Sequence, residues 1–352
     1  MLSESNFWFG KGVLVTGHSG FKGSWLTLWL RSLGAKVSGI SLPPKSNPSL
    51  FTLAKVDYEC HSYFCDVRNF SALTATLNEI QPEIIFHLAA QPLVRASYRD
   101  PIETFSTNIM GTVNILEALR VNGGARVAVM ITTDKVYRNH ETILPYGEND
   151  SLGGYDPYSS SKAASEIVIS SYRDSFFAEK GIAVASARSG NVIGGGDWSE
   201  DRLIPDAIRA WQKGGALDVR RPDAIRPWQH VLEPLSGYIK LAQKLWCNPN
   251  LADSYNFGPE PGNAATVYEV IELARKTYGK GVTRHAKNID GLHEAGLLTL
   301  EIKKAKELLG VRPRLSLAQA IMLTMDWYRE YETGANVCDL CDKQIKLYEE
   351  LL

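Results

Sequence analysis

The first half of the chain alternates short apolar runs with amphipathic stretches, and this alternation restricts the fold more than any other feature. The apolar runs have the length of strands, while the stretches between them have helical spacing. Parallel strands need such crossover helices, so the pattern predicts an α/β fold with a doubly wound, Rossmann-type parallel sheet. The expected strands are 12–17, 35–42, 62–67, 83–90, 126–133 and 182–190, and the expected long helices are 21–34, 102–123 and 158–181.

A glycine-rich turn follows the first predicted strand. The segment TGHSGFKG places Gly17, Gly20 and Gly23 in GxxGxxG spacing just before the first long helix. Glycines here permit a tight turn, close approach of a pyrophosphate to the backbone, and close packing of helix on sheet. The free N–H groups at the start of the helix favour an anion. The segment predicts a dinucleotide site, to which Lys22 would add positive charge, in preference to a purely structural turn.

The second predicted strand leaves the choice of dinucleotide open. An acid at its end would hold the adenosine ribose of NAD, but the strand ends in GISLPPK, with Ser41 and Lys45. This leaves room for the 2′-phosphate of NADP. Asp66, after SYFC, is the better candidate for contacting the adenine, and its alternative role is that of a helix cap or turn acid.

Tyr158 and Lys162 form a YxxxK motif, which places both side chains on one face of a helix. An ammonium close to a phenol stabilises the phenolate, so we expect the pKa of Tyr158 to fall below its usual value of about 10. A tyrosinate beside a nicotinamide can take a hydroxyl proton while the neighbouring carbon gives up hydride. The motif therefore predicts a catalytic pair.

The regular alternation ends near Arg188, where glycine, proline and tryptophan become dense. We expect residues 1–188 to form the dinucleotide-binding Rossmann domain, with a segment near 226–258 returning to it. Residues 189–352 are expected to form mainly a second, smaller mixed α/β lobe that binds substrate. A chain of 352 residues with 44% hydrophobic content can support two lobes.

The composition argues against several other classes of protein. A net charge of −1 gives no basic excess for binding nucleic acid. The start, MLSESNFWFGKG, is a poor signal peptide, and no apolar stretch approaches the length of a membrane span. Five cysteines are odd and sparse, which indicates reduced thiols in a cytoplasm. Cys338 and Cys341 form a CxxC pair without further ligands at zinc spacing, so we expect no metal.

Further motifs make nearly the whole chain resemble the extended short-chain dehydrogenase/reductase family, which contains nucleotide-sugar epimerases and dehydratases. HLAAQ (87–91) resembles the motif of the family's fourth strand, and NIMGTVNILEA resembles its NxxGTxN helix. RSGNVIGGGD resembles the stretch that opens the substrate lobe. IRPWQHVLEPL resembles the RDWxxVxD segment, and LEIKKAKELLGVRP resembles the closing lobe.

This resemblance implies a set of ligand contacts and an assembly. Asn191 and Arg226 correspond to residues at the sugar diphosphate. NAD is the expected cofactor, because the members that the chain resembles use it and no arginine follows the second strand. Helices 102–122 and 158–180 would pair across a two-fold axis, giving a homodimer or a dimer of dimers. The expected cofactor contacts are Gly17, His18, Gly20, Phe21, Lys22, Gly23, Asp66, Val67, Leu88, Ala89, Ala90, Asn108, Tyr158 and Lys162, and the expected substrate contacts are Gln91, Asn191, Arg202, Leu203, Arg226 and His293.

The stretch MITTDKVYR indicates the branch of the family. An apolar run over 127–131 leads through Thr132 and Thr133 to Asp134 and Lys135. In the family this strand ends in a catalytic threonine or serine. Epimerases continue with small uncharged residues, whereas 4,6-dehydratases continue with a general acid and a general base. The Thr-Asp-Lys triplet, together with HEAGLLTL (293–300), resembles the CDP-glucose 4,6-dehydratases, while the dTDP-glucose enzymes carry Thr-Asp-Glu.

The resemblance also implies roles in converting CDP-glucose to CDP-4-keto-6-deoxyglucose, a step toward deoxysugars of the O-antigen type. Tyr158 takes the proton of the 4-hydroxyl, which Thr133 orients, and NAD carries hydride from C4 to C6. Lys135 removes the C5 proton, and Asp134 protonates the departing C6 hydroxyl. A neutral Lys135 requires its pKa to fall by several units from about 10.4, and a protonated Asp134 would ease that requirement.

Several alternatives remain open at this point. The enzyme could be a 4,6-dehydratase of a dTDP-, UDP- or GDP-hexose, because no pattern in the sequence fits cytosine alone. It could be a 4-epimerase or 4-reductase, which would not need Asp134 and Lys135. It could be a non-catalytic nucleotide-binding scaffold, against which the intact Thr133, Tyr158 and Lys162 argue. The acid and base could also form an exposed salt bridge.

Overall fold

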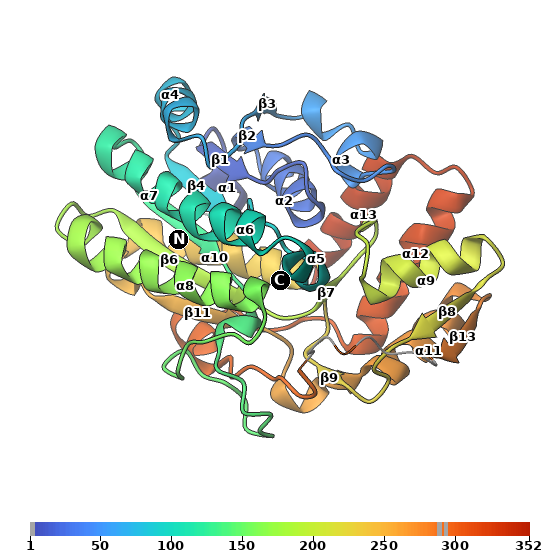
Figure 1. Ribbon diagram of the computed structural model, residues 1–352. Helices are drawn as coiled ribbons and strands as arrows, with labels where there is room; N and C mark the ends of the chain where they lie inside the picture. The colour runs from blue at the N-terminus through green and yellow to red at the C-terminus, as the bar shows by residue number, and fades with distance from the viewer. Residues whose placement is uncertain (1–3, 287–290, 292–294) are drawn as a thin grey trace.

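A seven-stranded parallel sheet forms the centre of the molecule (Figure 1). The computed structural model describes residues 4–286, 291 and 295–352. The strand order is β11-β6-β5-β4-β1-β2-β3, and each neighbouring pair is parallel, which confirms the predicted doubly wound sheet. The strands are β1 Gly12–Thr16, β2 Lys36–Ser41, β3 His61–Phe64, β4 Ile84–His87, β5 Val127–Ile131, β6 Ala183–Ser189 and β11 Ser254–Phe257.

Helices cover both faces of this sheet because its buried strands carry apolar residues on alternate sides. On one face, Leu14 of β1 belongs to a core that α4, α7 and α8 complete. On the other face, Val13 and Val15 belong to a larger core that includes Trp25 of α2 and Leu241 of α10. The helices on these faces are α1 Glu4–Trp8, α2 Phe21–Ser32, α4 Phe70–Ile80, α7 Gly111–Asn122, α8 Pro157–Tyr172 and α10 Leu232–Cys247.

A smaller mixed α/β lobe lies to one side of the sheet (Figure 1). Its strands β8 and β13 are parallel, and the Trp211 indole in α9 donates to the carbonyl of Val282 at 3.1 Å. Helices α11 and α12 pack together behind these strands. Apart from α10 and β11, the longer elements that follow β6 are β7 Val192–Ile193, α9 Leu203–Gln212, β8 Ala216–Val219, β9 Ile225–Arg226, β10 Gln229–His230, β12 Ala265–Thr266, α11 Val267–Tyr278, β13 Val282–His285, α12 Leu317–Glu332 and α13 Val337–Glu349.

The chain crosses between the two parts more than once. After β6 ends at Ser189, the chain leaves the sheet, and β11 then returns to pair with β6. The segment near 226–258 was expected to return to the Rossmann domain, and it contains both α10 and β11. The domain boundary at Arg188 itself stays a prediction.

The expected long helix 102–123 is not uniform. It consists of α6 Pro101–Phe105, a π-helical turn over Ser106–Met110, and α7, and the short helix α5 Val94–Arg99 precedes it. A second π-helical turn, Arg173–Phe177, extends α8. The remaining short helical segments are α3 Leu50–Leu53, Val56–Tyr58, Asp134–Val136, Pro249–Leu251, Pro261–Asn263 and Ala305–Leu309.

The C-terminal helices are fastened to the main body by one buried carboxylate. Glu233 of α10 accepts hydrogen bonds from the backbone N–H groups of Arg314 and Leu315 at 2.9 and 2.6 Å, and from the Tyr348 hydroxyl at 2.8 Å. Trp29 of α2 also donates to Glu349 at 2.8 Å. These bonds hold α13 against α2 and α10.

Over the described residues, no helix combines the length and apolar character that crossing a bilayer requires. The same residues contain no group of three or more histidine, cysteine or acidic side chains arranged to hold a metal ion. The cysteines are free thiols, with Cys341 buried and Cys338 partly buried.

Close packing of α10 against β11 gives a test of the fold. A Cβ added at Gly237 would lie 2.4 Å from the Phe257 ring, whereas one at Gly262 would meet no atom within 4 Å. We expect Gly237→Ala to lower the free energy of unfolding by about 1–3 kcal/mol, because overpacking forces the ring and helix apart. Thermal or urea unfolding measures the loss, with Gly262→Ala as the control. Equal stability of the two variants would contradict this packing.

Candidate active site

The predicted site residues meet in one large cleft at the carboxyl ends of the strands. The sheet order reverses between β1 and β4, which is where ligands bind in open α/β sheets. The cleft has a volume of about 1970 Å³ and extends from the glycine turn to β8 and β13 of the smaller lobe. The predicted residues that line it are Gly17, Gly20, Phe21, Lys22, Gly23, Asp66, Val67, Leu88, Ala89, Ala90, Gln91, Thr133, Asp134, Lys135, Tyr158, Lys162, Asn191, Arg202, Leu203 and Arg226.

The glycine turn has the shape that a pyrophosphate needs. Gly17 has φ +76°, and a Cβ there would lie 2.8 Å from the backbone nitrogen of Ala89. A Cβ on Gly23 would lie 2.0 Å from the carbonyl oxygen of Gly17, so the helix can approach the turn only without a side chain. Gly20 is the N-cap residue just before α2, and no side-chain hydrogen bond caps that end of the helix. The N–H groups of the first turn therefore remain suited to an anion, which fits a dinucleotide.

Lys22 reaches from the start of α2 across to the end of β6. Its ammonium donates to the Ser189 hydroxyl at the end of β6, at 2.9 Å. Burial lowers the pKa of Lys22 to about 7, the positive charge of Arg202 acts in the same direction, and Asp134 opposes both. Lys22 therefore belongs electrostatically to the catalytic end of the cleft.

Two of the predicted cofactor residues have different positions. The His18 ring is fully buried and forms a hydrogen bond with the Ser62 hydroxyl at 2.9 Å. It packs against Gly39, where an added Cβ would lie 2.2 Å from the ring. Burial lowers the pKa of His18 to about 4, so the ring is neutral. Among the described residues His18 is not part of the cleft lining, and its side chain supports the glycine turn from behind.

Asn108 also lies behind the described cleft lining. Its side-chain oxygen accepts from the N–H of Gln91 at 2.8 Å, and its amide donates to the carbonyl of Gln91 and to the Ser161 hydroxyl. Asn108 thus fixes the loop after β4 to helix α8. His293 lies outside the described residues.

The end of β5 delivers an acid into the cleft, in a buried position. Asp134 is 1% exposed, and its Oδ1 accepts from the Thr133 hydroxyl at 3.0 Å. Its Oδ2 is buried and has no hydrogen-bond partner among the described residues. Burial raises the pKa of Asp134, and this outweighs the opposing charge of Lys135 and the bond from Thr133. The alternative of an exposed salt bridge is wrong, and Asp134 is suited to act as an acid.

Tyr158 and Lys162 are both buried on the facing helix α8. The Lys162 ammonium donates to the carbonyl of Ile131 at 3.0 Å. Burial lowers the pKa of Lys162 to about 8, and the negative charge of Glu166 opposes the shift. Burial raises the pKa of Tyr158 to about 12, with Thr133 acting in the opposite direction. The expectation of a lowered tyrosine pKa is therefore wrong here, because desolvation outweighs the favourable contacts.

Four of the predicted substrate contacts, Asn191, Arg202, Leu203 and Arg226, lie in the chain that follows β6 and line the cleft. Arg202 bonds Asp197 at 2.8 Å. Arg226 donates to the carbonyl oxygens of Ile225 and Gly296 at 2.8 and 3.2 Å and also to that of Ala295. These bonds hold the guanidinium against the wall of the cleft.

Sequence reasoning missed a cationic cluster at the rim of the cleft. Arg95 and Arg99 of α5 and Arg220 after β8 make ion pairs with Asp201 at 3.2, 3.8 and 3.1 Å. All four residues line the cleft. The only local signal was a spacing of four residues between Arg95 and Arg99, which places both on one helical face.

Asp66 lines the cleft but is already paired. It accepts from the backbone and side chain of Arg68, and this bonding lowers its pKa and keeps it ionised. The alternative of a turn acid thus describes part of its role. Its position in the cleft leaves the adenine contact a prediction.

Comparison with known proteins gives a family and several relatives. The family described as GDP-mannose 4,6 dehydratase matches residues 14–324. A CDP-glucose 4,6-dehydratase of Salmonella typhimurium is 44% identical over 97% of this chain and 96% of its own length. A dTDP-glucose 4,6-dehydratase of Streptomyces venezuelae, solved with NAD bound, has a TM-score of 0.79 at 24% identity, covering 91% of this chain and 98% of that one. A UDP-glucose 4-epimerase of Stenotrophomonas maltophila has a TM-score of 0.81 at 22% identity, covering 92% and 100%.

The buried Asp134 gives a test of the site that needs no ligand. Its pKa is raised in the folded state, so folding favours the protonated form, and the carboxyl costs stability as the pH rises above its unfolded pKa of about 4. We expect Asp134→Asn to raise the Tm at pH 7 by about 2 °C or more. The advantage should shrink as the pH falls toward 4. Thermal unfolding at a series of pH values measures it, with the exposed Asp174→Asn as control, and a lower Tm for Asp134→Asn at pH 7 would contradict the assignment.

Proposed function

The chain belongs to the GDP-mannose 4,6 dehydratase family, and from this premise we propose that it converts CDP-glucose to CDP-4-keto-6-deoxyglucose and water. The observation that best supports this function is the buried acid Asp134, which lies beside Thr133. Both residues line the same cleft as Tyr158 and Lys162. An epimerase has no use for a buried acid at this position. The relative with 44% identity is named for the proposed reaction.

NAD is the proposed cofactor, and when bound it accepts hydride from C4 of the sugar and returns it to C6. The turn at Gly17 and Gly20 and the start of α2 would hold its pyrophosphate. Asp66 and Val67 line the cleft beyond β3, on the side proposed for adenosine. The cleft also includes the backbone from Leu88 to Ala90.

Tyr158 performs the first proton transfer in this proposal. It must lose its own proton before it can take one from the C4 hydroxyl, and burial opposes that loss. Hydrogen bonding with the Thr133 hydroxyl and the positive charge of Arg202 favour the phenolate. Lys162, one turn along the same face of α8, adds a further positive charge. Thr133 also stands ready to hydrogen-bond the C4 oxygen.

Asp134 and Lys135 divide the elimination between them. The raised pKa of Asp134 allows the acid to carry a proton for the departing C6 hydroxyl. Lys135 is partly buried at the next position and is proposed to take the C5 proton. C5 regains a proton when hydride reaches C6, which completes the 4-keto-6-deoxy product. A proton held on Asp134 removes the negative charge that would otherwise keep Lys135 an ammonium. In this proposal a protonated acid stands beside a neutral amine, and such a pair is suited to acid and base roles.

The diphosphate of the substrate is assigned to the smaller lobe. We propose that Asn191 and Arg226 contact it, with Arg202 and Leu203 lining the approach. The arginines around Asp201 add positive charge to the rim of the cleft, which suits an anionic substrate. A bidentate guanidinium is well matched to phosphate oxygens.

A homodimer is the proposed assembly, or a dimer of two such dimers. Exposed apolar side chains lie along α6, the π-helical turn that follows it, and α8. Ile102 is 80% exposed, Met110 is 49% exposed and Ile167 is 61% exposed. Such a surface suits pairing between copies of these helices. The free thiols suit the reducing environment of a cytoplasm, which is the proposed compartment.

Substrate selection tests the proposal directly. We expect CDP-glucose to be converted with a kcat/KM at least roughly tenfold above those of dTDP-, UDP- and GDP-hexoses, because a site that bonds one base leaves polar groups unpaired with another. The alkaline ultraviolet absorbance of the 4-keto product measures turnover, and mass spectrometry identifies the loss of water. Formation of a C4 epimer without water loss would support the epimerase alternative. Preference for another nucleotide would show that the enzyme is a 4,6-dehydratase of that nucleotide sugar.

Two variants separate the halves of the mechanism. Tyr158→Phe should lower turnover by roughly 100-fold or more, because it removes the group that takes the first proton, while the variant still binds NAD. Lys135→Ala should leave that first step intact and stall afterwards. Its quenched reaction should contain, stoichiometric with enzyme, a nucleotide sugar that has lost two hydrogens but no water. Turnover by Lys135→Ala near the wild-type rate would exclude Lys135 as the base.

A further inference from the structure

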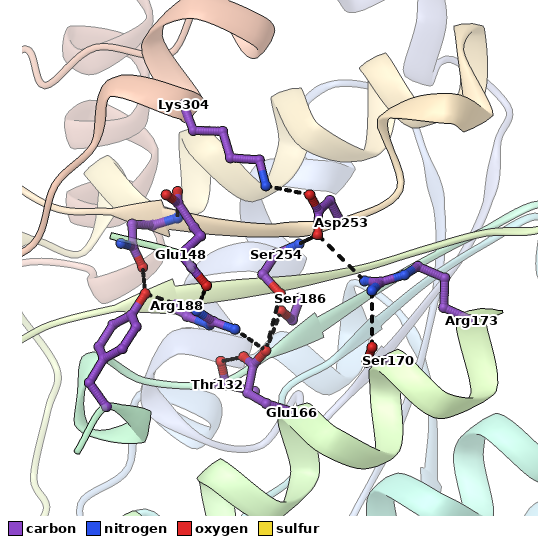
Figure 2. Close-up of polar contacts among 12 residues, drawn as sticks. Thr132, Glu148, Glu166, Ser170, Arg173, Ser186, Arg188, Asp253, Ser254 and Lys304 are labelled. Carbon is purple, nitrogen blue, oxygen red and sulfur yellow. Dashed lines mark hydrogen bonds and ion pairs between the residues drawn. The ribbon is translucent and has the colours of Figure 1, made fainter. Parts of the chain in front are cut away.

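A buried polar network lies directly behind the catalytic end of β5 (Figure 2). Its centre is Glu166, which follows Lys162 by one turn of α8 and is 3% exposed. Its carboxylate accepts from the hydroxyls of Thr132 and Ser186 at 2.5 and 2.7 Å, and from the Arg188 guanidinium at 2.7 Å. Ser254 of β11 adds a longer bond at 3.3 Å. One side chain thus joins the catalytic helix to three neighbouring strands.

Thr132 transmits this anchoring to the catalytic threonine. Its hydroxyl is held by Glu166, and its N–H donates to the carbonyl of Ala187 in β6 at 2.9 Å. Thr133 is the next residue, so its backbone position is set by these bonds on its neighbour. Its hydroxyl can contact both Tyr158 and Asp134 only if that backbone stays in place.

Glu166 also supplies charge to the site. Burial alone would raise its pKa, but the bond and charge of Arg188, with the hydroxyls of Thr132 and Ser186, lower it, so the group is ionised. Its negative charge favours the ammonium form of Lys162 against the effect of burial. The ionisable groups that also face Lys162 include Tyr158, one turn earlier on α8, Lys22 of α2, whose charge repels it, and the neutral His87 of β4. Glu166 is thus the counter-charge that supports a protonated Lys162.

Arg188 is itself held on its other side. It donates to the Tyr137 hydroxyl at 2.9 Å and to the carbonyl of Glu148 at 3.1 Å, and Tyr137 donates on to Asn256 at 2.7 Å. Figure 2 shows the network continuing outward through Asp253 to Lys304 and Arg173. A buried ion pair is weak evidence for stability, because desolvation offsets much of its attraction. Its link to the catalytic residues indicates another role.

We propose that Glu166, fixed by Arg188, is a positioning residue for the dehydration reaction: it places Thr133 through Thr132 and keeps Lys162 charged. The inference rests on the proposed function for its assay. The proposal assigns Glu166 no contact with the reacting atoms. It acts through the backbone of β5 and through the electrostatic field at α8.

The test is Glu166→Gln, which keeps the size of the side chain and removes its charge. We expect kcat to fall roughly 10- to 100-fold while KM stays within about threefold, because substrate contacts remain and the catalytic geometry does not. Glu166 raises the pKa of Lys162, so its neutralisation lowers that pKa and Lys162 loses its proton at lower pH. The alkaline limb of the kcat profile should move to lower pH by roughly one unit.

Two control variants separate placement from charge and from general destabilisation. Thr132→Val removes the hydroxyl bond without changing charge, so kcat should fall and the alkaline limb should stay. Glu233→Gln alters another buried, hydrogen-bonded carboxylate, which anchors the C-terminal helices and is not part of the described cleft lining. It should lower the Tm and leave kcat and its pH profile unchanged.

The assay uses whichever nucleotide hexose the wild type dehydrates. If CDP-glucose is not that substrate, the proposed function is wrong, but the role of Glu166 can still be tested. A Glu166→Gln variant with wild-type kcat, or with an unmoved alkaline limb, would overturn the proposal. If that variant does not fold, the double variant Glu166→Gln/Arg188→Met removes both charges together. The same shift of the alkaline limb is expected from it, and its absence counts against the proposal equally.

Discussion

The hydrogen bond from the Lys162 ammonium to the carbonyl oxygen of Ile131, at 3.0 Å, is the contact on which the site depends. Ile131 is the last residue of β5, and Lys162 lies in the middle of α8. The bond therefore sets the distance between the strand that ends in Thr133 and the helix that carries Tyr158. Any substrate held between them meets groups from two elements whose spacing is fixed before it arrives.

The surrounding serines and Asn108 make that spacing rigid. The Ser165 hydroxyl donates to the carbonyl of Asn108 at 2.9 Å, while the Asn108 amide donates to Ser161 at 2.8 Å. Small hydroxyl side chains on α8 let the helices approach closely and still satisfy each polar group. The resulting block of helices and strands holds the catalytic groups on regular structure, where geometry is better defined than on loops.

Burial, more than any single charge pair, determines the proton chemistry of the cleft. It lowers the pKa of Lys22 to about 7 and that of Lys162 to about 8, and it raises the pKa of Tyr158 to about 12 and that of Asp134. Each shift favours the neutral form. Groups brought nearer to neutrality in this way can exchange protons with a sugar at smaller free-energy cost than fully solvated ions. Behind the cleft lining, Glu166 and Arg188 behave differently, since each stabilises the other as an ion.

Local patterns predicted the strands, the glycine turn and the YxxxK helix because each depends on residues close together in the sequence. The contact of Lys22 with Ser189 spans 167 positions, and no periodicity relates them. The inward turn of His18 depends on the missing side chain of Gly39 on the neighbouring strand, which becomes visible only when β1 and β2 are paired. The error on Tyr158 has the same origin, since the motif gives the neighbouring lysine but not the extent of burial.

Gly190 shows how the site accommodates an acid that burial disfavours. A Cβ at Gly190 would lie 2.9 Å from Oδ2 of Asp134 and 2.5 Å from the Pro227 ring. The glycine therefore leaves clear the one carboxyl oxygen that lacks a described hydrogen-bond partner, while Thr133 occupies the other. An acid oxygen that is buried without a hydrogen-bond partner costs stability in the protein alone, and its position makes sense as a group reserved for a reacting hydroxyl.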